Sequence, residues 1–209
     1  MKEQRISASV IKRLPRYYRF LGELKKQGIT RISSGELATK MKLTASQIRQ
    51  DLNHFGGFGQ QGYGYNVELL YDEIGEILGL SSLTSAIMLG IGKLGVVVAE
   101  NMDFKKQGFR LIGAFDVSEA VIGKTVAGIE VQNLSKLEEF CKKYKPKAAF
   151  MCVPSSAAPE LANKLIDLGV VGFWNFSHYD IGINHPEVFV ENVHFGDTLM
   201  RLSYKIKNS

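Results

Sequence analysis

Apolar residues recur at helical spacing through the first part of the chain. Between residues 10 and 24 an apolar side chain returns every three or four positions, with lysines and arginines in the intervals. This periodicity predicts an amphipathic helix, and Gly28 is a typical stop signal after it. Pro15 lies inside the run and predicts either a kink or the start of a second helix, because proline lacks the N–H group that a continuous helix uses.

Two helix-start signatures follow, eleven residues apart. They are the capping boxes Ser33-x-x-Glu36 and Thr44-x-x-Gln47. We expect a short helix after each box, the second one ending near Gly56. Two short helices with this connection are typical of a helix-turn-helix, which would span about residues 17–56. The alternative is an ordinary solvated helix pair in a helical domain.

The second of these helices carries residues suited to reading DNA. In a helix-turn-helix the second helix enters the major groove, where arginine can pair with guanine and glutamine or asparagine with adenine. The candidate contacts are Ala45, Ser46, Gln47, Arg49, Gln50 and Asn53. The glycine-rich segment that follows predicts a wing, with Gln60, Gln61 and Tyr63 as further DNA contacts. A linker turn is the alternative for this segment.

After residue 66 the pattern changes to alternating strands and helices. One amphipathic helix is expected at 67–80, and the polar stretch 81–85 is the expected domain boundary. Further strands are expected at 86–89, 110–115, 128–131, 148–153, 171–176 and 188–194, and helices at 134–144 and 157–168. The alternation predicts a doubly wound parallel sheet.

The fold class is therefore α/β, with a winged helix-turn-helix in front of the sheet. We expect a DNA-binding domain at 1–80, a nucleotide-binding domain at 81–194 and a terminal helix at 195–209. The terminal helix is rich in apolar residues, which indicates burial against another surface such as a second subunit.

The segment between the first two strands of the sheet carries the most specific motif. Gly90-x-Gly92-x-x-Gly95 stands between an apolar run and a helical run, which is the context of a dinucleotide-binding turn of the Rossmann type. Asp116 follows at the end of the next strand, where an acid binds the ribose hydroxyls and favours NAD(H) over NADP(H). A plain turn residue is the alternative for Asp116. The expected cofactor contacts are Gly90, Ile91, Gly92, Lys93, Leu94, Gly95, Asp116, Val153, Pro154, Asn175 and Phe176.

Charge divides the chain at the same place as the pattern. Residues 1–66 hold twelve lysines and arginines against four acids, a net charge of +8, whereas residues 67–209 carry a net charge of −3. The basic part is suited to a polyanion such as DNA. Neither a membrane span nor a secretory signal is evident, so we expect a cytoplasmic protein. Cys141 and Cys152 are too few for a disulfide framework, and no metal site is expected.

An NAD-dependent enzyme, or a nucleotide- or CoA-binding protein with a helical accessory domain, is the second hypothesis. The predicted sheet fits it equally well, because fold does not determine function. A dehydrogenase needs an acid or base at the hydride site, and the chain has no Tyr-x-x-x-Lys motif. His178, His185 and His194 are candidates by residue type alone. We therefore expect that this protein is not an enzyme.

Eight motifs along the chain resemble those of the Rex family of redox-sensing transcriptional repressors. They are RLPRYYRFL at 13–21, RISSGELA at 31–38, SQIRQDLNHFG at 46–56, GYGYNVE at 62–68, GIGKLG at 90–95, AFDV at 114–117, VPSSAAPELA at 153–162 and NFS at 175–177. The resemblance implies a homodimer with a domain-swapped terminal helix. It also implies that the protein binds palindromic double-stranded DNA. In this family NAD+ permits the binding and NADH releases the DNA.

Some positions depart from the family's pattern. The wing has Gln60-Gln61 where the family has a basic pair, and the glycine motif has Lys93 in place of asparagine. The resemblance implies a switch in which Arg16 takes part, but Asn101 and His194 stand where the family has a tyrosine and an aspartate. A repressor that keeps DNA binding with an altered or lost NADH response is the third hypothesis.

Overall fold

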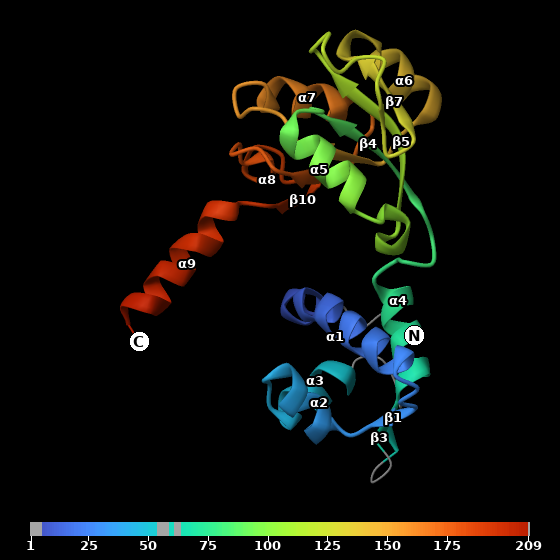
Figure 1. The fold of residues 1–209 in the computed structure, drawn as a ribbon, viewed down its shortest axis with the longest axis vertical. Helices are drawn as coiled ribbons and strands as arrows, with labels where there is room; N and C mark the ends of the chain where they lie inside the picture. The colour runs from blue at the N-terminus through green and yellow to red at the C-terminus, as the bar shows by residue number, and fades with distance from the viewer. Residues whose placement is uncertain (1–5, 54–58, 61–63, 209) are drawn as a thin grey trace. The chain divides into compact units, whose positions relative to one another are not determined.

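The computed structural model describes residues 6–53, 59–60 and 64–208 (Figure 1). The chain divides into two compact units, Met1–Ser81 and Ser82–Ser209. Some expected features lie outside the described residues. They are the wing residues Gln61 and Tyr63, the side chain of Gln60, and the helix end near Gly56.

The first unit begins with one long helix, α1 (Ala8–Lys26), capped by the side chain of Ser7. The helix runs through Pro15, so the alternative of a second helix starting there is wrong. Proline removes one backbone hydrogen bond, but Leu14, Tyr17 and Leu21 beside it are fully buried. Their packing holds the helix together across the missing bond.

Two short helices, α2 (Ser34–Met41) and α3 (Ala45–Leu52), form the helix-turn-helix. At Ser33 the capping box is complete, because its hydroxyl accepts from the Glu36 N–H and Glu36 accepts from the Ser33 N–H. At Thr44 the box is half formed: the hydroxyl accepts from the Gln47 N–H at 3.1 Å, but the Gln47 amide donates to Asp51 instead. In a complete box the Gln47 side-chain oxygen would accept from the Thr44 N–H. The charge-assisted hydrogen bond from the Gln47 amide to Asp51 draws the side chain away from that position.

A small antiparallel sheet completes the first unit. Its strands are β1 (Arg31–Ile32), β2 (Gly59–Gln60) and β3 (Gly64–Asn66), in the order β1-β3-β2. Helix α4 (Val67–Ile77) follows directly and is capped by the side chain of Asn66. The order α1, β1, α2, α3, β2, β3 is the architecture of a winged helix, and α4 follows it.

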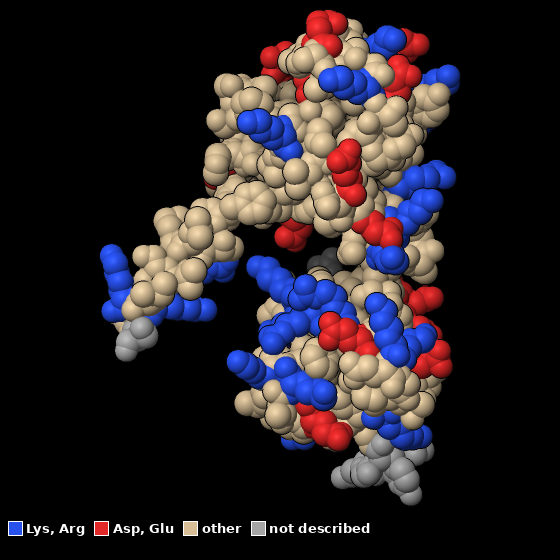
Figure 2. Space-filling model, in the orientation of Figure 1, with Lys and Arg blue, Asp and Glu red and all other residues tan. Residues whose placement is uncertain are grey.

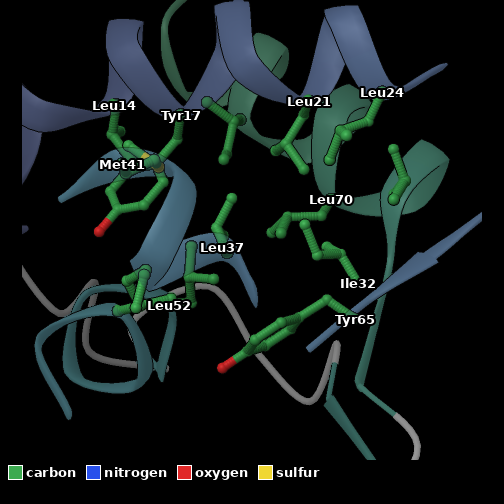
Figure 3. Packing of buried hydrophobic residues seen from close by; sticks show 14 of the residues in the cluster. Leu14, Tyr17, Leu21, Leu24, Ile32, Leu37, Met41, Leu52, Tyr65 and Leu70 are labelled. Carbon is green, nitrogen blue, oxygen red and sulfur yellow. The ribbon is translucent and has the colours of Figure 1, made fainter. Parts of the chain in front are cut away.

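Apolar side chains from α1, β1, α2, α3, β3 and α4 fill the core of the first unit. Figure 3 shows Leu14, Tyr17, Leu21 and Leu24 of α1 facing side chains of α2, α3, β1, β3 and α4. These residues recur three or four positions apart on α1, as the sequence pattern predicts. The helix-turn-helix is therefore built on α1.

The second unit contains a seven-stranded sheet in the order β10-β9-β8-β4-β5-β7-β6. Its strands are β4 (Thr84–Leu89), β5 (Phe109–Asp116), β6 (Thr125–Val126), β7 (Ile129–Asn133), β8 (Ala148–Met151), β9 (Gly172–Asn175) and β10 (Phe189–Asn192). The described pairs are parallel apart from β6 with β7. Without the β6 edge this is the doubly wound order whose direction reverses beside β4.

Helices cover both faces of this sheet (Figure 1). They are α5 (Lys93–Asn101), α6 (Leu137–Tyr144) and α7 (Ala158–Asp167). Ile87 and Leu89 of β4 pack with α6 and α7, whereas Ala86 and Met88 pack with α5. Burial on both faces explains why β4 has no polar alternation in its sequence.

Several short elements were not expected from the sequence. They are β1, η2 (Phe104–Gln107), β6 and α8 (Ile181–Asn184). The helix expected at 134–144 is present as η3 (Leu134–Lys136) followed by α6. The chain ends in α9 (Phe195–Lys207), close to the expected terminal helix.

Candidate functional site

The turn between β4 and α5 depends on two glycines for its close packing. Gly90 has φ +86°, and a Cβ atom there would collide with the carbonyl of Cys152 at the end of β8. A Cβ atom on Gly95 would collide with the carbonyl oxygen of Gly90. Both glycines thus let α5 and β8 approach the turn closely, as a dinucleotide-binding turn requires.

The middle glycine has a different environment. Gly92 is the N-cap of α5, and no described side chain caps the helix there. Apart from Gly92 and its two chain neighbours, no described residue has an atom within 4 Å of the position that a Cβ on Gly92 would take. The backbone at Gly92 therefore faces open space, next to uncapped N–H groups and the positive end of the helix dipole. This arrangement suits a phosphate group.

Asp116 lies beside this turn at the end of β5. Its Oδ2 accepts a hydrogen bond from the Ile91 N–H at 2.5 Å, and its Oδ1 accepts one from the Ser118 N–H at 2.8 Å. These bonds hold the carboxylate in one orientation, while each oxygen keeps a lone pair for a ribose hydroxyl. A phosphate on the 2′ oxygen would be repelled by this charge.

Ile91 and its neighbours play unequal parts at the turn. The Ile91 side chain is buried and its N–H is bonded to Asp116, so its part is structural within the turn. Lys93 and Leu94 are exposed in the first turn of α5. Val153 and Pro154 follow β8, and a Val153 methyl group would lie 3.0 Å from a Cβ on Gly90. Val153 therefore borders the glycine turn.

The side chain of Asn175, an expected cofactor contact, makes hydrogen bonds within its own unit. It is fully buried at the end of β9, and its amide donates to the Tyr179 carbonyl and to Asn192 Oδ1, both at 2.8 Å. Its Oδ1 accepts from the backbone N–H and the hydroxyl of Ser177. With these bonds in place, its side chain shapes the loop after β9.

The aromatic ring of Phe176 comes next and is half-buried. It packs against Trp174 and against Phe195, the first residue of α9, with ring centroids 4.5 and 6.4 Å away. The end of β9 is therefore in direct contact with the start of α9.

Neither cysteine has the environment of a reactive thiol. Burial raises the pKa of Cys152, beside the glycine turn, to about 12 and the pKa of Cys141 to about 11. Thiolates are the oxidisable form and are scarce at neutral pH when the pKa is this high. A redox response of this protein would therefore depend on a bound ligand rather than on its thiols.

Helix α3 presents polar side chains to solvent. Ser46, Arg49, Gln50 and Asn53 are exposed, and the Arg49 guanidinium bonds to the Ser34 hydroxyl at 3.1 Å. Ala45 is half-buried against the core, which differs from its expected place among the outward residues. Gln47 is also half-buried, with its amide directed to Asp51.

Basic side chains gather over α1 and its neighbouring helices in Figure 2. Helix α1 has no acid in its first turn and ends with Lys25 and Lys26. Asp51 is the acid of α3, and it is buried and paired with Arg13. The solvent-facing surface of α3 is therefore free of negative charge, which suits contact with phosphates.

The three expected switch residues each contact residues of their own unit. Arg16 donates to the Met41 carbonyl at the end of α2. Asn101, the last residue of α5, donates to the Val97 carbonyl at 2.9 Å.

His194 is the N-cap of α9. Its Nε2 lies 3.2 Å from the Ser177 carbonyl oxygen, and its Nδ1 lies 3.8 Å from an Asp197 carboxylate oxygen. The residue therefore holds the start of α9 to the loop after β9. The structure does not bring Asn101 and His194 into a described contact with each other.

Helix α9 exposes the apolar residues expected to be covered. None of Phe195–Lys207, all within the described chain, is buried, and Leu199, Leu202 and Ile206 are 66%, 51% and 65% exposed. These three recur at positions i, i+3 and i+7 and share one face. Such a face is typical of a helix that packs against a partner.

The sequence interpretation assigns no role to Asp51 of the first unit. In the structure Asp51 is the centre of a buried hydrogen-bond network. Its place between Ile48 and Leu52 on the buried side of α3 was the available signal, because an acid there needs partners.

No helix within residues 6–53, 59–60 and 64–208 has the length and apolar character that a membrane span requires. No group of three or more His, Cys, Asp or Glu side chains among them is arranged to hold a metal ion.

Known proteins resemble this chain in both units. A family model described as "Putative DNA-binding protein N-terminus" matches residues 5–53, and one described as "CoA binding domain" matches residues 81–179. The redox-sensing transcriptional repressor Rex of Caldicellulosiruptor saccharolyticus is 46% identical, over 98% of this chain and 93% of that protein. The Rex repressor of Clostridium perfringens is 44% identical, over 100% of this chain and 98% of that protein.

Solved structures agree with these relatives. RSP in complex with β-NAD+ and operator DNA has a TM-score of 0.90 and 44% identity, covering 97% of this chain and 93% of RSP. RSP in complex with β-NADH has a TM-score of 0.88 and 41% identity, covering 98% and 96%.

A winged helix-turn-helix followed by a doubly wound nucleotide-binding fold defines a class of ligand-regulated DNA-binding proteins. This chain belongs to the Rex family of redox-sensing transcriptional repressors. The resemblance and the fold class predicted from the sequence are both confirmed.

Proposed function

We propose that this protein represses transcription by binding operator DNA, and that NADH weakens that binding. The observation that supports this proposal most directly is the turn at Gly92 beside the fixed carboxylate of Asp116, on the same chain as a basic helix-turn-helix. The RSP structures with β-NAD+ and operator DNA, and with β-NADH, support the same pairing of ligands. Relatives at 44–46% identity are named as repressors, which argues against the enzyme hypothesis.

In this proposal NAD(H) lies across the carboxyl ends of the parallel strands. Its pyrophosphate lies at the N-terminus of α5 near Gly92, and Lys93 is near enough along the chain to add a positive charge. Asp116 binds the adenosine ribose, and Val153, Pro154 and Phe176 border the site from the ends of β8 and β9.

CoA is the second candidate ligand, because a family model with that description matches residues 81–179. CoA carries a phosphate on its adenosine ribose, and the carboxylate of Asp116 would repel it. We therefore expect NADH to displace any bound CoA, a result that competition calorimetry can measure.

We propose that the protein binds palindromic DNA as a cytoplasmic homodimer, with α9 exchanged between the subunits. The exposed apolar face of α9 supports this, because it would be covered by the partner. Two recognition helices related by a two-fold axis would match two half-sites of a palindrome.

The deciding experiment compares operator affinity without nucleotide, with NAD+ and with NADH. A duplex selected by the protein from a random-sequence library is the probe, at fixed salt. We expect tight binding with NAD+ and weaker binding with NADH. Equal affinity in all three conditions would leave a DNA-binding protein whose switch is lost, as Asn101 and His194 allow. If the protein selects no duplex from the library even at low salt, the proposal is refuted.

Replacing Arg49 with alanine is expected to weaken operator binding by about 1–3 kcal/mol if Arg49 reads a base. The residue is exposed on α3, and its described partner is the hydroxyl of Ser34, so the loss should come from DNA contact rather than from folding. Electrophoretic shift titrations with the selected duplex and a random duplex measure it. An equal loss on both duplexes would mean a phosphate contact instead.

A further inference from the structure

Asp51 lies where a negative charge is least expected, on the recognition helix of a DNA-binding unit. It is fully buried on the inner side of α3. The Arg13 guanidinium of α1 donates to both carboxylate oxygens at 2.7 Å, in a two-pronged salt bridge. The Tyr17 hydroxyl, also on α1, donates to Oδ2 at 2.9 Å. The carboxylate thus ties α3 to the helix on which the unit is built.

The electrostatics agree with a permanent charge at this position. Burial alone would raise the pKa of Asp51, but hydrogen bonds from Arg13, Gln47 and Tyr17 together hold that pKa below its ordinary value. Burial and the hydrogen bond to Asp51 raise the pKa of Tyr17, so its hydroxyl stays a donor. The Asp51 carboxylate is therefore ionised at neutral pH, and it acts purely as an acceptor of hydrogen bonds.

The fourth bond of Asp51 goes to a residue of the DNA-facing end of the helix. The Gln47 amide nitrogen donates to Oδ1 at 2.8 Å. Because a carboxylate accepts and never donates, the nitrogen side of the amide has to face Asp51. The Gln47 carbonyl oxygen and its second N–H remain available. One donor beside one acceptor is the pattern that pairs with the N7 and N6 groups of adenine.

We propose that Asp51 is a positioning residue for base recognition, which fixes the Gln47 amide in one orientation so that Gln47 reads an adenine in each operator half-site. The inference rests on the proposed DNA binding. Gln47 is the third residue of α3, at the end of a recognition helix that meets base edges. Without Asp51 the amide can turn over and present its donor and acceptor in the opposite order, which no longer matches adenine.

The test measures base preference, pair by pair. The wild-type protein first selects a duplex from a random-sequence library, and its affinity is then measured for every single base-pair substitution of that duplex. We expect one A·T pair in each half-site whose replacement costs the wild type about 5- to 150-fold. Gln47→Ala should remove this preference, Asp51→Asn should remove it at the same pair, and the double variant should lose no more than either single variant.

Controls separate positioning from stability. Ile74→Ala truncates a fully buried side chain on α4, so it should lower the melting temperature while leaving the preference intact. If Asp51→Asn does not fold, the pair Arg13→Met with Asp51→Leu removes both charges together and leaves neither unpaired. It should lose the same base preference as Gln47→Ala.

The outcomes distinguish this inference from the proposed function. A folded Asp51 variant that keeps full preference at the pair lost in Gln47→Ala overturns the positioning role. Gln47→Ala with an unchanged preference at every pair overturns it as well. A wild-type protein that selects no duplex refutes DNA recognition itself, before any variant is compared.

Discussion

Replacing Gly92 with alanine is expected to weaken NAD(H) binding strongly while the protein stays folded. Apart from its two chain neighbours, a Cβ on Gly92 would meet no described residue within 4 Å, and the backbone there has an ordinary φ of −75°. The added methyl group would instead enter the space proposed for the pyrophosphate. Losing two charge-assisted hydrogen bonds to the phosphates costs about 3–6 kcal/mol, which weakens binding by about 100-fold or more. Calorimetric titration with NADH measures this loss.

Two further glycines are matched controls for this prediction. Gly95→Ala brings a Cβ against the Gly90 carbonyl oxygen, so it should lower the free energy of unfolding as well as nucleotide binding. Gly172→Ala on β9 makes ordinary contacts of 3.8 Å and should change neither. Urea unfolding of the three variants separates the effects. Wild-type NADH affinity in Gly92→Ala would show that the phosphates do not approach this backbone.

The same variant tests the coupling between ligand and DNA. If NADH acts through the turn at Gly92, operator affinity of Gly92→Ala should no longer depend on added NADH. Its affinity without nucleotide should stay near that of the wild type, because α3 belongs to the other unit.

Local signals predicted much of the fold because their physical causes are local. The complete capping box at Ser33 uses atoms within four residues. The glycine turn needs positions without a Cβ atom, and the spacing of the glycines in the motif marks these positions directly. The doubly wound sheet followed from apolar runs buried on both faces. The two-residue strand β6 is too short to leave such a pattern in the sequence.

Long-range partners explain what the sequence could not predict. Gln47 has the right spacing for a capping box, but Asp51 competes for its amide, and Asp51 is buried because α1 packs over it. Asn175 was correctly placed at a strand end, yet its bond to Asn192 requires β10 to lie beside β9. In both cases a polar side chain is occupied by a group that arrives only with the tertiary structure.

Introducing two charges on α9, with Leu199→Glu and Leu202→Glu, is expected to convert the proposed dimer into monomers. Each leucine is more than half exposed in the single chain, and burying a leucine side chain contributes about 1.5–3 kcal/mol. A glutamate at either place would have to lose its hydration in the interface, which costs more than the leucine contributes. Sedimentation analysis at micromolar concentration measures the change in mass.

Loss of the dimer should then appear in DNA binding. A dimer holds its second recognition helix at high local concentration after the first one binds, so monomers should bind a palindromic duplex about 100- to 10,000-fold more weakly. Their affinity for a single half-site should stay unchanged, because α3 and its basic surroundings lie in the first unit. Arg201→Glu is the matched control, since it changes the net charge by the same −2 but lies on a different face of α9 from Leu199 and Leu202. A dimeric double variant with wild-type operator affinity would mean that another surface joins the subunits.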